Sequence, residues 1–145
     1  MDAVAYKKNY IKLLNVSKYN FNQYQFDGIE WCIRNELSNV GGGLIADEMG
    51  LGKTIMMIAT IVCNFKMPTL IVLPNVLLEQ WKEQIYKTTG HKAIVYHGQV
   101  KKILTAKQLQ HMPIILTTYG TVLADARKDK KLQQVKWGRI ICDEA

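Results

Sequence analysis

The sequence has few of the residues that build disulfide frameworks and metal sites. Its 145 residues include three cysteines and three histidines, and neither set has a CxxC or other metal-ligand spacing. This odd, scattered set of cysteines argues against a disulfide framework and against a zinc site. Because each cysteine lies in an apolar segment, we expect buried, reduced thiols. The cysteines are Cys32, Cys63 and Cys142.

Long apolar runs and negative charges are also scarce. The longest apolar run, residues 55–63, is far shorter than a membrane span, and the N-terminus has no signal-peptide hydrophobic region. The 12 acidic and 19 basic residues give a net charge of +7. This charge favours a polyanionic partner such as nucleic acid, although many basic proteins bind none. With 48% hydrophobic residues, the length suits one intracellular domain with a real core.

The most informative segment is the octet Asp-Glu-Met-Gly-Leu-Gly-Lys-Thr at residues 47–54. It lies between the apolar residues 43–46 and 55–59, which is the strand, loop and helix setting of a phosphate-binding loop. Glycines bring backbone N–H groups close to phosphates, and the following helix adds its positive dipole end. Lys53 would reach the β- and γ-phosphates, and Thr54 would hold magnesium. The candidate nucleotide-binding residues here are Asp47, Glu48, Met49, Gly50, Leu51, Gly52, Lys53 and Thr54.

The rest of the pattern alternates between apolar strands and amphipathic helices. Apolar spacing predicts helices over residues 24–37, from near Lys53 to about 65, from Pro74 onward, and over 101–110. Short apolar runs predict strands at residues 43–46, 69–73, 93–96, 114–116 and 137–142. Such alternation predicts an α/β fold with a parallel sheet that is covered by helices on both faces. Residues 1–20 show weak periodicity, and we expect a lead-in segment there.

The acidic pair Asp143 and Glu144 follows the last predicted strand. Ligands of open α/β sheets bind at the carboxyl ends of the strands, where this pair lies. There, Asp143 could hold magnesium, and Glu144 could orient and deprotonate an attacking water. The alternative is a solvated strand end, because an Asp-Glu pair by itself is common.

Together these motifs resemble the ATPase motor of SWI/SNF-type chromatin-remodelling and DNA-translocating enzymes, within helicase superfamily two, which also has viral members of the global-transactivator kind. The octet matches that family's loop residue for residue. Residues 21–25 with Gly28 and Trp31 resemble its adenine-recognition segment, although Asn22 and Gln23 replace a common basic residue and proline. Further similar segments, in the family's order, are residues 70–81, 96–98, 116–119 and 137–145, the last leading into an Asp-Glu-Ala-His box.

The resemblance implies a RecA-like ATP-binding lobe over residues 21–145, truncated at that box and without the second lobe that supplies arginine fingers. We therefore expect the chain alone to hydrolyse ATP negligibly. In the whole enzyme, ATP and magnesium would be bound, and Gln25 would select adenine. Double-stranded DNA would be held through its backbone, without sequence specificity. Candidate DNA contacts are Pro74, Asn75, Thr117 and Thr118. Chromatin or transcription proteins are possible partners, in the nucleus or in a host nucleus if the source is viral.

Several alternatives remain open. An RNA helicase or a restriction-type translocase belongs to the same superfamily, although the interior of the octet disfavours both, and a non-catalytic decoy lobe is a third reading. Thr117 and Thr118 could instead serve ordinary strand-end capping. We expect Tyr24 to pack rather than stack on a base, and Trp81 and Trp137 to lie in the core. The basic residues 127–131, like Lys101 and Lys102, fit a solvated surface better than a DNA-contacting loop.

Overall fold

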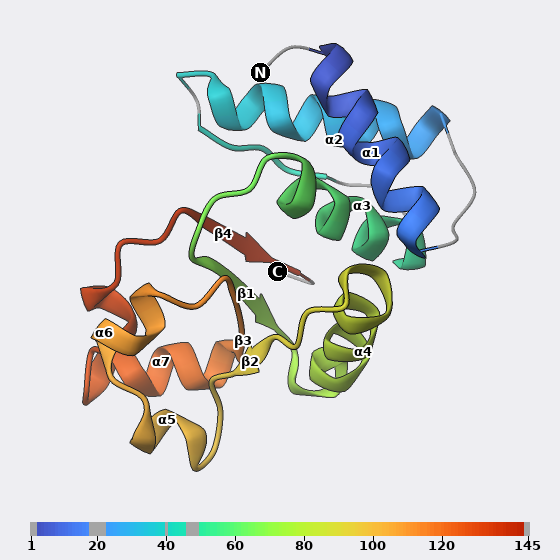
Figure 1. Ribbon diagram of the computed structural model, residues 1–145. Coiled ribbons are helices and arrows are strands. Elements are labelled where there is room, and N and C mark those ends of the chain that lie inside the picture. Colours follow the sequence, from blue (N-terminus) through green and yellow to red (C-terminus); the bar gives the residue numbers. More distant parts are fainter. Residues whose placement is uncertain (1–2, 18–22, 40, 46–49, 144–145) are drawn as a thin grey trace. The chain divides into compact units, whose positions relative to one another are not determined.

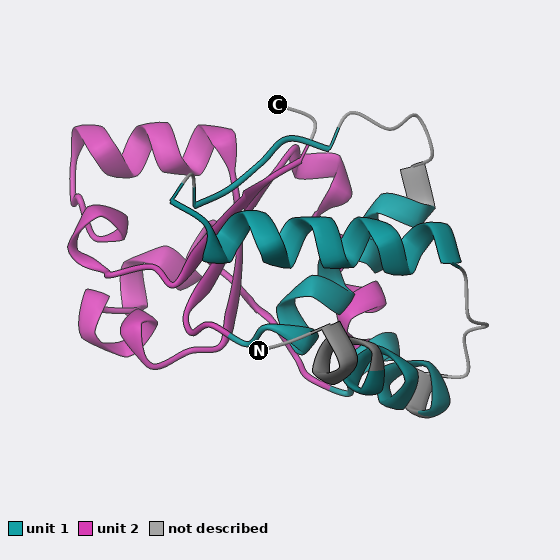
Figure 2. Ribbon diagram, turned by 90° about the horizontal axis from the view of Figure 1, so that it is seen from above, with its two compact units in different colours: residues 1–65, 87–90 teal, residues 66–86, 91–145 magenta. Residues whose placement is uncertain are grey.

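The computed structural model describes residues 3–17, 23–39, 41–45 and 50–143. These residues fold as two compact units, which Figure 2 shows in different colours. Unit 1 consists of residues 1–65 and 87–90, and unit 2 consists of residues 66–86 and 91–145. Each unit has a hydrophobic cluster of its own.

Three helices build unit 1: α1 (Ala3–Ser17), α2 (Gln23–Leu37) and α3 (Gly50–Cys63), drawn from blue to green in Figure 1. Helices α2 and α3 agree with the predicted ones to within a few residues. On α2, Phe26, Ile29 and Ile33 recur at three- and four-residue spacing, so they share one buried face. The core side chains are Tyr10, Leu13, Leu14, Phe26, Ile29, Ile33, Met56, Ala59 and Cys63.

Helix α1 occupies most of the stretch expected to be a lead-in segment, where no helix was predicted. Its buried residues Tyr10, Leu13 and Leu14 have helical spacing, but they are too few to stand out in a segment rich in lysine and asparagine. A helix of this length is only marginally stable by itself in water. Burial of these three side chains against α2 and α3 supplies the missing stability.

The strand predicted at residues 43–46 is not formed where the structure describes it. Residues 41–45 have no regular structure, and Ala46 lies outside the described residues. A strand requires a hydrogen-bonded partner, and every strand pairing among the described residues belongs to unit 2. A Cβ atom added to Gly43 would lie 2.6 Å from the Trp31 ring, so glycine allows the ring to lie against this segment.

A four-stranded parallel sheet forms the centre of unit 2. Its strands are β1 (Thr69–Leu73), β2 (Ile94–Val95), β3 (Ile114–Thr118) and β4 (Arg139–Cys142), in the spatial order β2-β3-β1-β4. All five residues of β1 and of β3 are buried, as continuous apolar strands predict. In register, Leu73 of β1 pairs with Thr118 of β3. The predicted α/β class with a parallel sheet is confirmed.

The helices of unit 2 connect these strands (Figure 1). They are η1 (Asn75–Leu77), α4 (Leu78–Thr89), α5 (Val100–Ile103), α6 (Ala106–Gln110), α7 (Tyr119–Arg127) and η2 (Leu132–Gln134). Helix α4 ends in unit 1. The single helix predicted over residues 101–110 is in fact two. Leu104 has an extended backbone, and Thr105 starts α6 with a capping box that it forms with Gln108.

Asp125 links three elements in the core of unit 2. This carboxylate is 7% exposed, and it accepts hydrogen bonds from the Tyr96 hydroxyl and from the Leu132 N–H, each 3.0 Å long. Burial, followed by this hydrogen bond and the carboxylate charge, raises the pKa of Tyr96 well above its usual value. The phenol therefore keeps its proton and acts as the donor. These bonds fasten α7 to η2 and to the end of β2.

The three cysteines are free thiols in different environments. Cys63 is buried in the unit 1 core, as predicted, whereas Cys142 is exposed and Cys32 is half-buried. The expectation of burial was wrong for Cys142 because only alternate residues of β4 are covered, a pattern that an apolar sequence run does not reveal.

The order in which the cysteines are chemically modified should follow their exposure to solvent. Burial raises the pKa of Cys63 to about 11, so this thiol stays protonated and unreactive well above neutral pH. We expect an alkylating reagent at pH 8 to modify Cys142 first and to reach Cys63 only after denaturation. Peptide mass spectrometry of native and urea-treated samples measures this order. Early modification of Cys63 in the native sample would contradict its burial.

Candidate nucleotide-binding site

The phosphate-loop sequence leads into α3. Of the octet, Gly50 to Thr54 lie in the first turns of this helix, whereas Asp47, Glu48 and Met49 lie outside the described residues. Thr54 is 6% exposed, and Lys53 is half-buried. The first N–H groups of a helix have no partners within it, and they form the positive end of its dipole. A lysine and a hydroxyl at this end of a 14-residue helix suit phosphate oxygens.

Gln25, the candidate adenine-reading residue, lies on α2 in the same unit. Its side chain is half-buried, and Oε1 accepts a hydrogen bond of 3.3 Å from the Tyr10 hydroxyl of α1. Tyr24, its neighbour, is 48% exposed. No sequence pattern connects Tyr10 with Gln25, because the two lie 15 residues apart with no shared motif.

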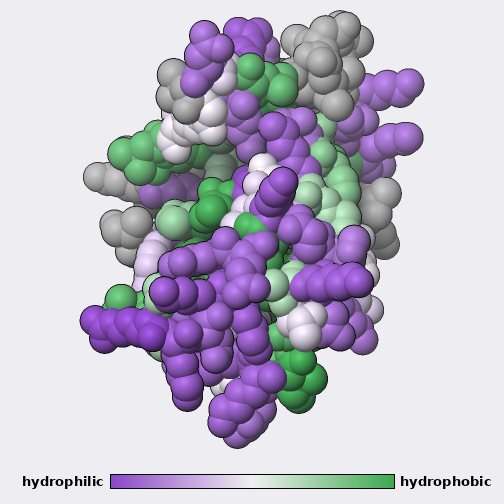
Figure 3. Space-filling view, turned by 90° about the vertical axis from the view of Figure 1, so that its left-hand side faces the viewer, coloured by the Kyte–Doolittle hydropathy of each residue, from purple (hydrophilic) through white to green (hydrophobic). Residues whose placement is uncertain are grey.

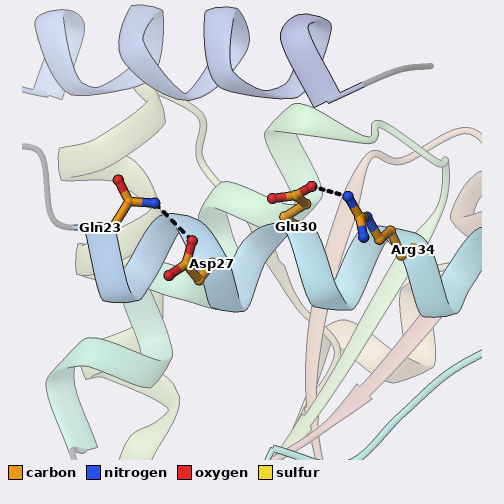
Figure 4. Close-up of polar contacts among 4 residues, drawn as sticks. All are labelled: Gln23, Asp27, Glu30 and Arg34. Carbon is orange, nitrogen blue, oxygen red and sulfur yellow. Dashed lines mark hydrogen bonds and ion pairs between the residues drawn. The ribbon is translucent and has the colours of Figure 1, made fainter.

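The exposed surface of α2 carries two pairs of side chains, one turn apart in each case (Figure 4). Gln23 Nε2 donates to Asp27 Oδ1 over 2.8 Å, and Arg34 forms an ion pair with Glu30. Pairs four residues apart stabilise a helix by a few tenths of a kcal/mol each, about 0.2–0.5. Gln23 thus supports the first turn of the helix that holds Gln25.

Asp143 is held at the carboxyl edge of the unit 2 sheet, just after β4. Its N–H donates to the Val72 carbonyl of β1 over 3.0 Å. Its carboxylate Oδ2 accepts from the Trp81 indole N–H over 3.1 Å, and its carbonyl accepts from the Tyr119 hydroxyl over 2.8 Å. Groups from three elements therefore fix this aspartate. Glu144 lies outside the described residues.

Trp81 and Tyr119 were not recognised in the sequence as partners of Asp143. Trp81 is 2% exposed, which confirms its predicted place in the core, but its polar N–H also reaches a candidate site. The 62 residues between Trp81 and Asp143 hide this contact from any local pattern. Tyr119 offered a weak signal, since it ends the Leu-Thr-Thr-Tyr motif at the same edge of the sheet.

The candidate DNA contacts lie at this same edge, after β1 and at the end of β3. The Thr117 hydroxyl donates to the Tyr96 carbonyl over 2.8 Å, and the residue is fully buried. Thr118 caps α7 by accepting from the Thr121 N–H over 3.0 Å. Both hydroxyls thus have the strand-end role that the sequence left open. Pro74 is half-buried and Asn75 is exposed where η1 begins. Contact of these four residues with DNA stays a prediction.

The two basic runs adjoin one another in unit 2. Lys131 Nζ donates to the Lys101 carbonyl over 2.8 Å, which brings the start of η2 to α5. Lys102, Arg127 and Lys128 are exposed, and Figure 3 shows hydrophilic side chains over much of the face that α5, α6 and α7 present. The exposure of these three residues agrees with a solvated basic surface, and whether the two runs contact DNA stays a prediction.

No helix within the described ranges is both long and apolar enough to cross a membrane. Likewise, no group of three or more His, Cys, Asp or Glu side chains in those ranges could hold a metal ion.

A parallel sheet with crossover helices, together with a Gly-Lys-Thr sequence at the start of a helix, is typical of RecA-like α/β proteins. The SNF2-related domain model matches residues 24–145, and the chain belongs to this family. A solved structure, the Sulfolobus solfataricus SWI2/SNF2 ATPase core in complex with dsDNA, is similar with a TM-score of 0.71 and 35% identity. That similarity covers 86% of this chain and 26% of the Sulfolobus chain, and it confirms the predicted fold.

Two curated relatives show the same resemblance in sequence. The chain is 37% identical over 144 residues to the ATP-dependent helicase rhp16 of Schizosaccharomyces pombe. It is 33% identical over 140 residues to the chromatin-remodeling ATPase INO80 of Mycosarcoma maydis. These alignments cover 87% and 85% of this chain, but they span only 16% and 7% of the two relatives.

Proposed function

We propose that this chain is the ATP-binding part of a DNA-dependent ATPase that moves along double-stranded DNA and remodels protein–DNA complexes. The observation that carries the proposal is the family match over residues 24–145, with Lys53 and Thr54 in the first turns of α3. The names of the relatives support it, since one is called a helicase and another a remodeling ATPase. The similar Sulfolobus core was solved with dsDNA.

Within this proposal, the residues of each unit take separate roles. In unit 1, Lys53 binds the β- and γ-phosphates, and Thr54 offers its hydroxyl to magnesium. In unit 2, Asp143 offers a carboxylate, and Glu144 orients the attacking water. Hydroxyl and carboxylate oxygens suit magnesium, which takes one or two protein carboxylates and completes its shell with phosphates and water. When bound, the metal would neutralise charge on the phosphates.

Asp143 fits a metal-binding role because its position is fixed by other groups. The Trp81 N–H bonds to one carboxylate oxygen, and two further hydrogen bonds hold the backbone of this residue. Carboxylates that bind metals are generally oriented by such hydrogen bonds, which set the geometry before the metal arrives. Trp81 is itself buried, so it can hold this orientation without exchange with water.

The DNA-binding part of the proposal places Pro74, Asn75, Thr117 and Thr118 along the backbone of one strand. They would contribute affinity without sequence specificity, because phosphates carry no direct sequence information. The net charge of +7 supports a polyanionic partner. We further propose that the partners include chromatin or transcription proteins and that the protein acts in the nucleus. The support for this proposal is the name of the Mycosarcoma maydis relative, a chromatin-remodeling ATPase.

The test is ATP hydrolysis by the longest reading frame that contains this chain. Turnover is measured without nucleic acid, with double-stranded DNA, and with single-stranded RNA of equal length. We expect double-stranded DNA to stimulate turnover and RNA to leave it at the basal rate. Because phosphate contacts release counterions, stimulation should weaken as salt concentration rises. Stimulation by RNA alone would instead indicate an RNA helicase, and ATP binding without any turnover would indicate a non-catalytic lobe.

A further inference from the structure

Helix α1 has no part in the proposed function, yet one of its side chains touches the candidate adenine-reading residue. The Tyr10 hydroxyl donates to Gln25 Oε1 over 3.3 Å. The Tyr10 side chain is 0% exposed, and its ring stacks on Phe26 with centroids 5.8 Å apart and an interplanar angle of 28°. Phe26 follows Gln25 directly, so Tyr10 contacts α2 through both its ring and its hydroxyl.

The position of Tyr10 is itself firmly set. Leu13 and Leu14, three and four residues further along α1, are 7% and 6% exposed in the same core cluster. That cluster also contains Ile29 and Ile33 of α2 and Met56 of α3. A buried aromatic ring has two rotatable bonds and close neighbours on all sides, so its hydroxyl is a stable reference point for a more flexible partner.

We propose that Tyr10 is a positioning residue for adenine selection, which it achieves by orienting the Gln25 carboxamide. The inference rests on the proposed role of Gln25. A carboxamide oxygen has two acceptor sites, so the Tyr10 hydroxyl and the exocyclic amino group of adenine can both donate to Oε1. The Nε2 group of Gln25 can then donate to a ring nitrogen of the base. Guanine presents an acceptor oxygen in place of that amino group and cannot use this orientation.

The energetic consequence is preorganisation. A glutamine side chain has several rotatable bonds, and ordering it upon binding costs conformational entropy. A hydrogen bond formed before the nucleotide arrives removes part of that cost and so tightens adenine binding. Guanine nucleotides do not use the oriented carboxamide, so the gain applies to ATP and not to GTP. The ratio of the two affinities therefore reports the orienting effect.

The experiment is Tyr10→Phe in the 145-residue chain, which removes the hydroxyl and keeps the buried ring. Fluorescent ATP and GTP analogues are titrated with magnesium present, and dissociation constants are compared. Because one hydrogen bond is lost, we expect ATP affinity to fall about two- to tenfold while GTP affinity stays the same. A merely structural effect would lower both affinities equally, and that result would overturn the inference.

Tyr96→Phe is the matched control. It also removes a hydroxyl from a buried tyrosine, but this one binds Asp125 in unit 2. We expect it to leave the ATP/GTP affinity ratio unchanged. Thermal denaturation of both variants shows how much each hydroxyl contributes to stability. A change in the ratio for Tyr96→Phe as large as that for Tyr10→Phe would also overturn the inference.

A third variant, Gln25→Ala, distinguishes the positioning role of Tyr10 from the adenine-reading role of Gln25 on which it rests. If Gln25→Ala abolishes the preference for ATP and Tyr10→Phe keeps the wild-type ratio, then Gln25 reads adenine without help from Tyr10. The inference then fails while the proposed function stands. If Gln25→Ala leaves the ATP/GTP affinity ratio unchanged, Gln25 does not read the base, and the inference about Tyr10 fails as well. Loss of preference in both variants supports the inference.

Discussion

Lys53→Ala is expected to reduce ATP turnover by about 10²- to 10³-fold, the range typical of removing one charge-stabilising group from an active site. Lys53 lies in the first turns of α3, where its ammonium group adds to the positive end of the helix dipole. In the proposed site both charges act on the same phosphates, and alanine removes the stronger one. The measurement is steady-state ATP hydrolysis by the longest reading frame that contains this chain, with saturating double-stranded DNA.

The control for this prediction is Lys12→Ala. Lys12 lies on α1 in the same unit and is exposed, so the variant loses the same charge without loss of packing. We expect wild-type turnover from Lys12→Ala and unchanged thermal denaturation from both variants. Lys53 is only half-buried, and alanine is a good helix former, so a folding defect is not expected. Wild-type turnover from Lys53→Ala would show that Lys53 does not bind the phosphates.

Asp125→Ala is expected to destabilise the protein by about 3–5 kcal/mol. The substitution removes two hydrogen bonds to a buried charged group, and it leaves the Tyr96 hydroxyl and the Leu132 N–H without this acceptor. A loss of that size approaches the whole stability of many small domains. Urea denaturation followed by circular dichroism measures the change, with the midpoint compared at constant slope.

Asp129→Ala serves as the matched control, because Asp129 is exposed and lies four residues further along the chain. It removes the same charge, and we expect a change within about 0.5 kcal/mol. Asp125→Asn should fall between the two, since an amide oxygen can still accept one of the hydrogen bonds. Equal stability of Asp125→Ala and Asp129→Ala would show that the Asp125 network does not hold α7 and η2 in place.

Local patterns predicted most elements of this fold. The apolar spacing of Phe26, Ile29 and Ile33 marked α2, and the runs at residues 69–73 and 114–116 marked two central strands. The same patterns failed where stability comes from distant partners. Helix α1 depends on contacts with α2 and α3. Residues 41–45, which include the described part of the strand predicted at residues 43–46, pair with none of the described strands.

The functional residues show the same division between features of the local sequence and contacts of the tertiary structure. The sequence by itself determined the family, the α/β class and the candidate phosphate-binding residues, because a phosphate loop is a continuous segment whose residue types carry its function. Only the tertiary structure decided that Tyr10 contacts Gln25, that Trp81 holds Asp143, and that the Thr117 hydroxyl bonds to the Tyr96 carbonyl. These contacts join residues from different elements, and no local spacing encodes them. They form because packing brings buried polar groups together, and most buried polar groups in proteins are hydrogen-bonded.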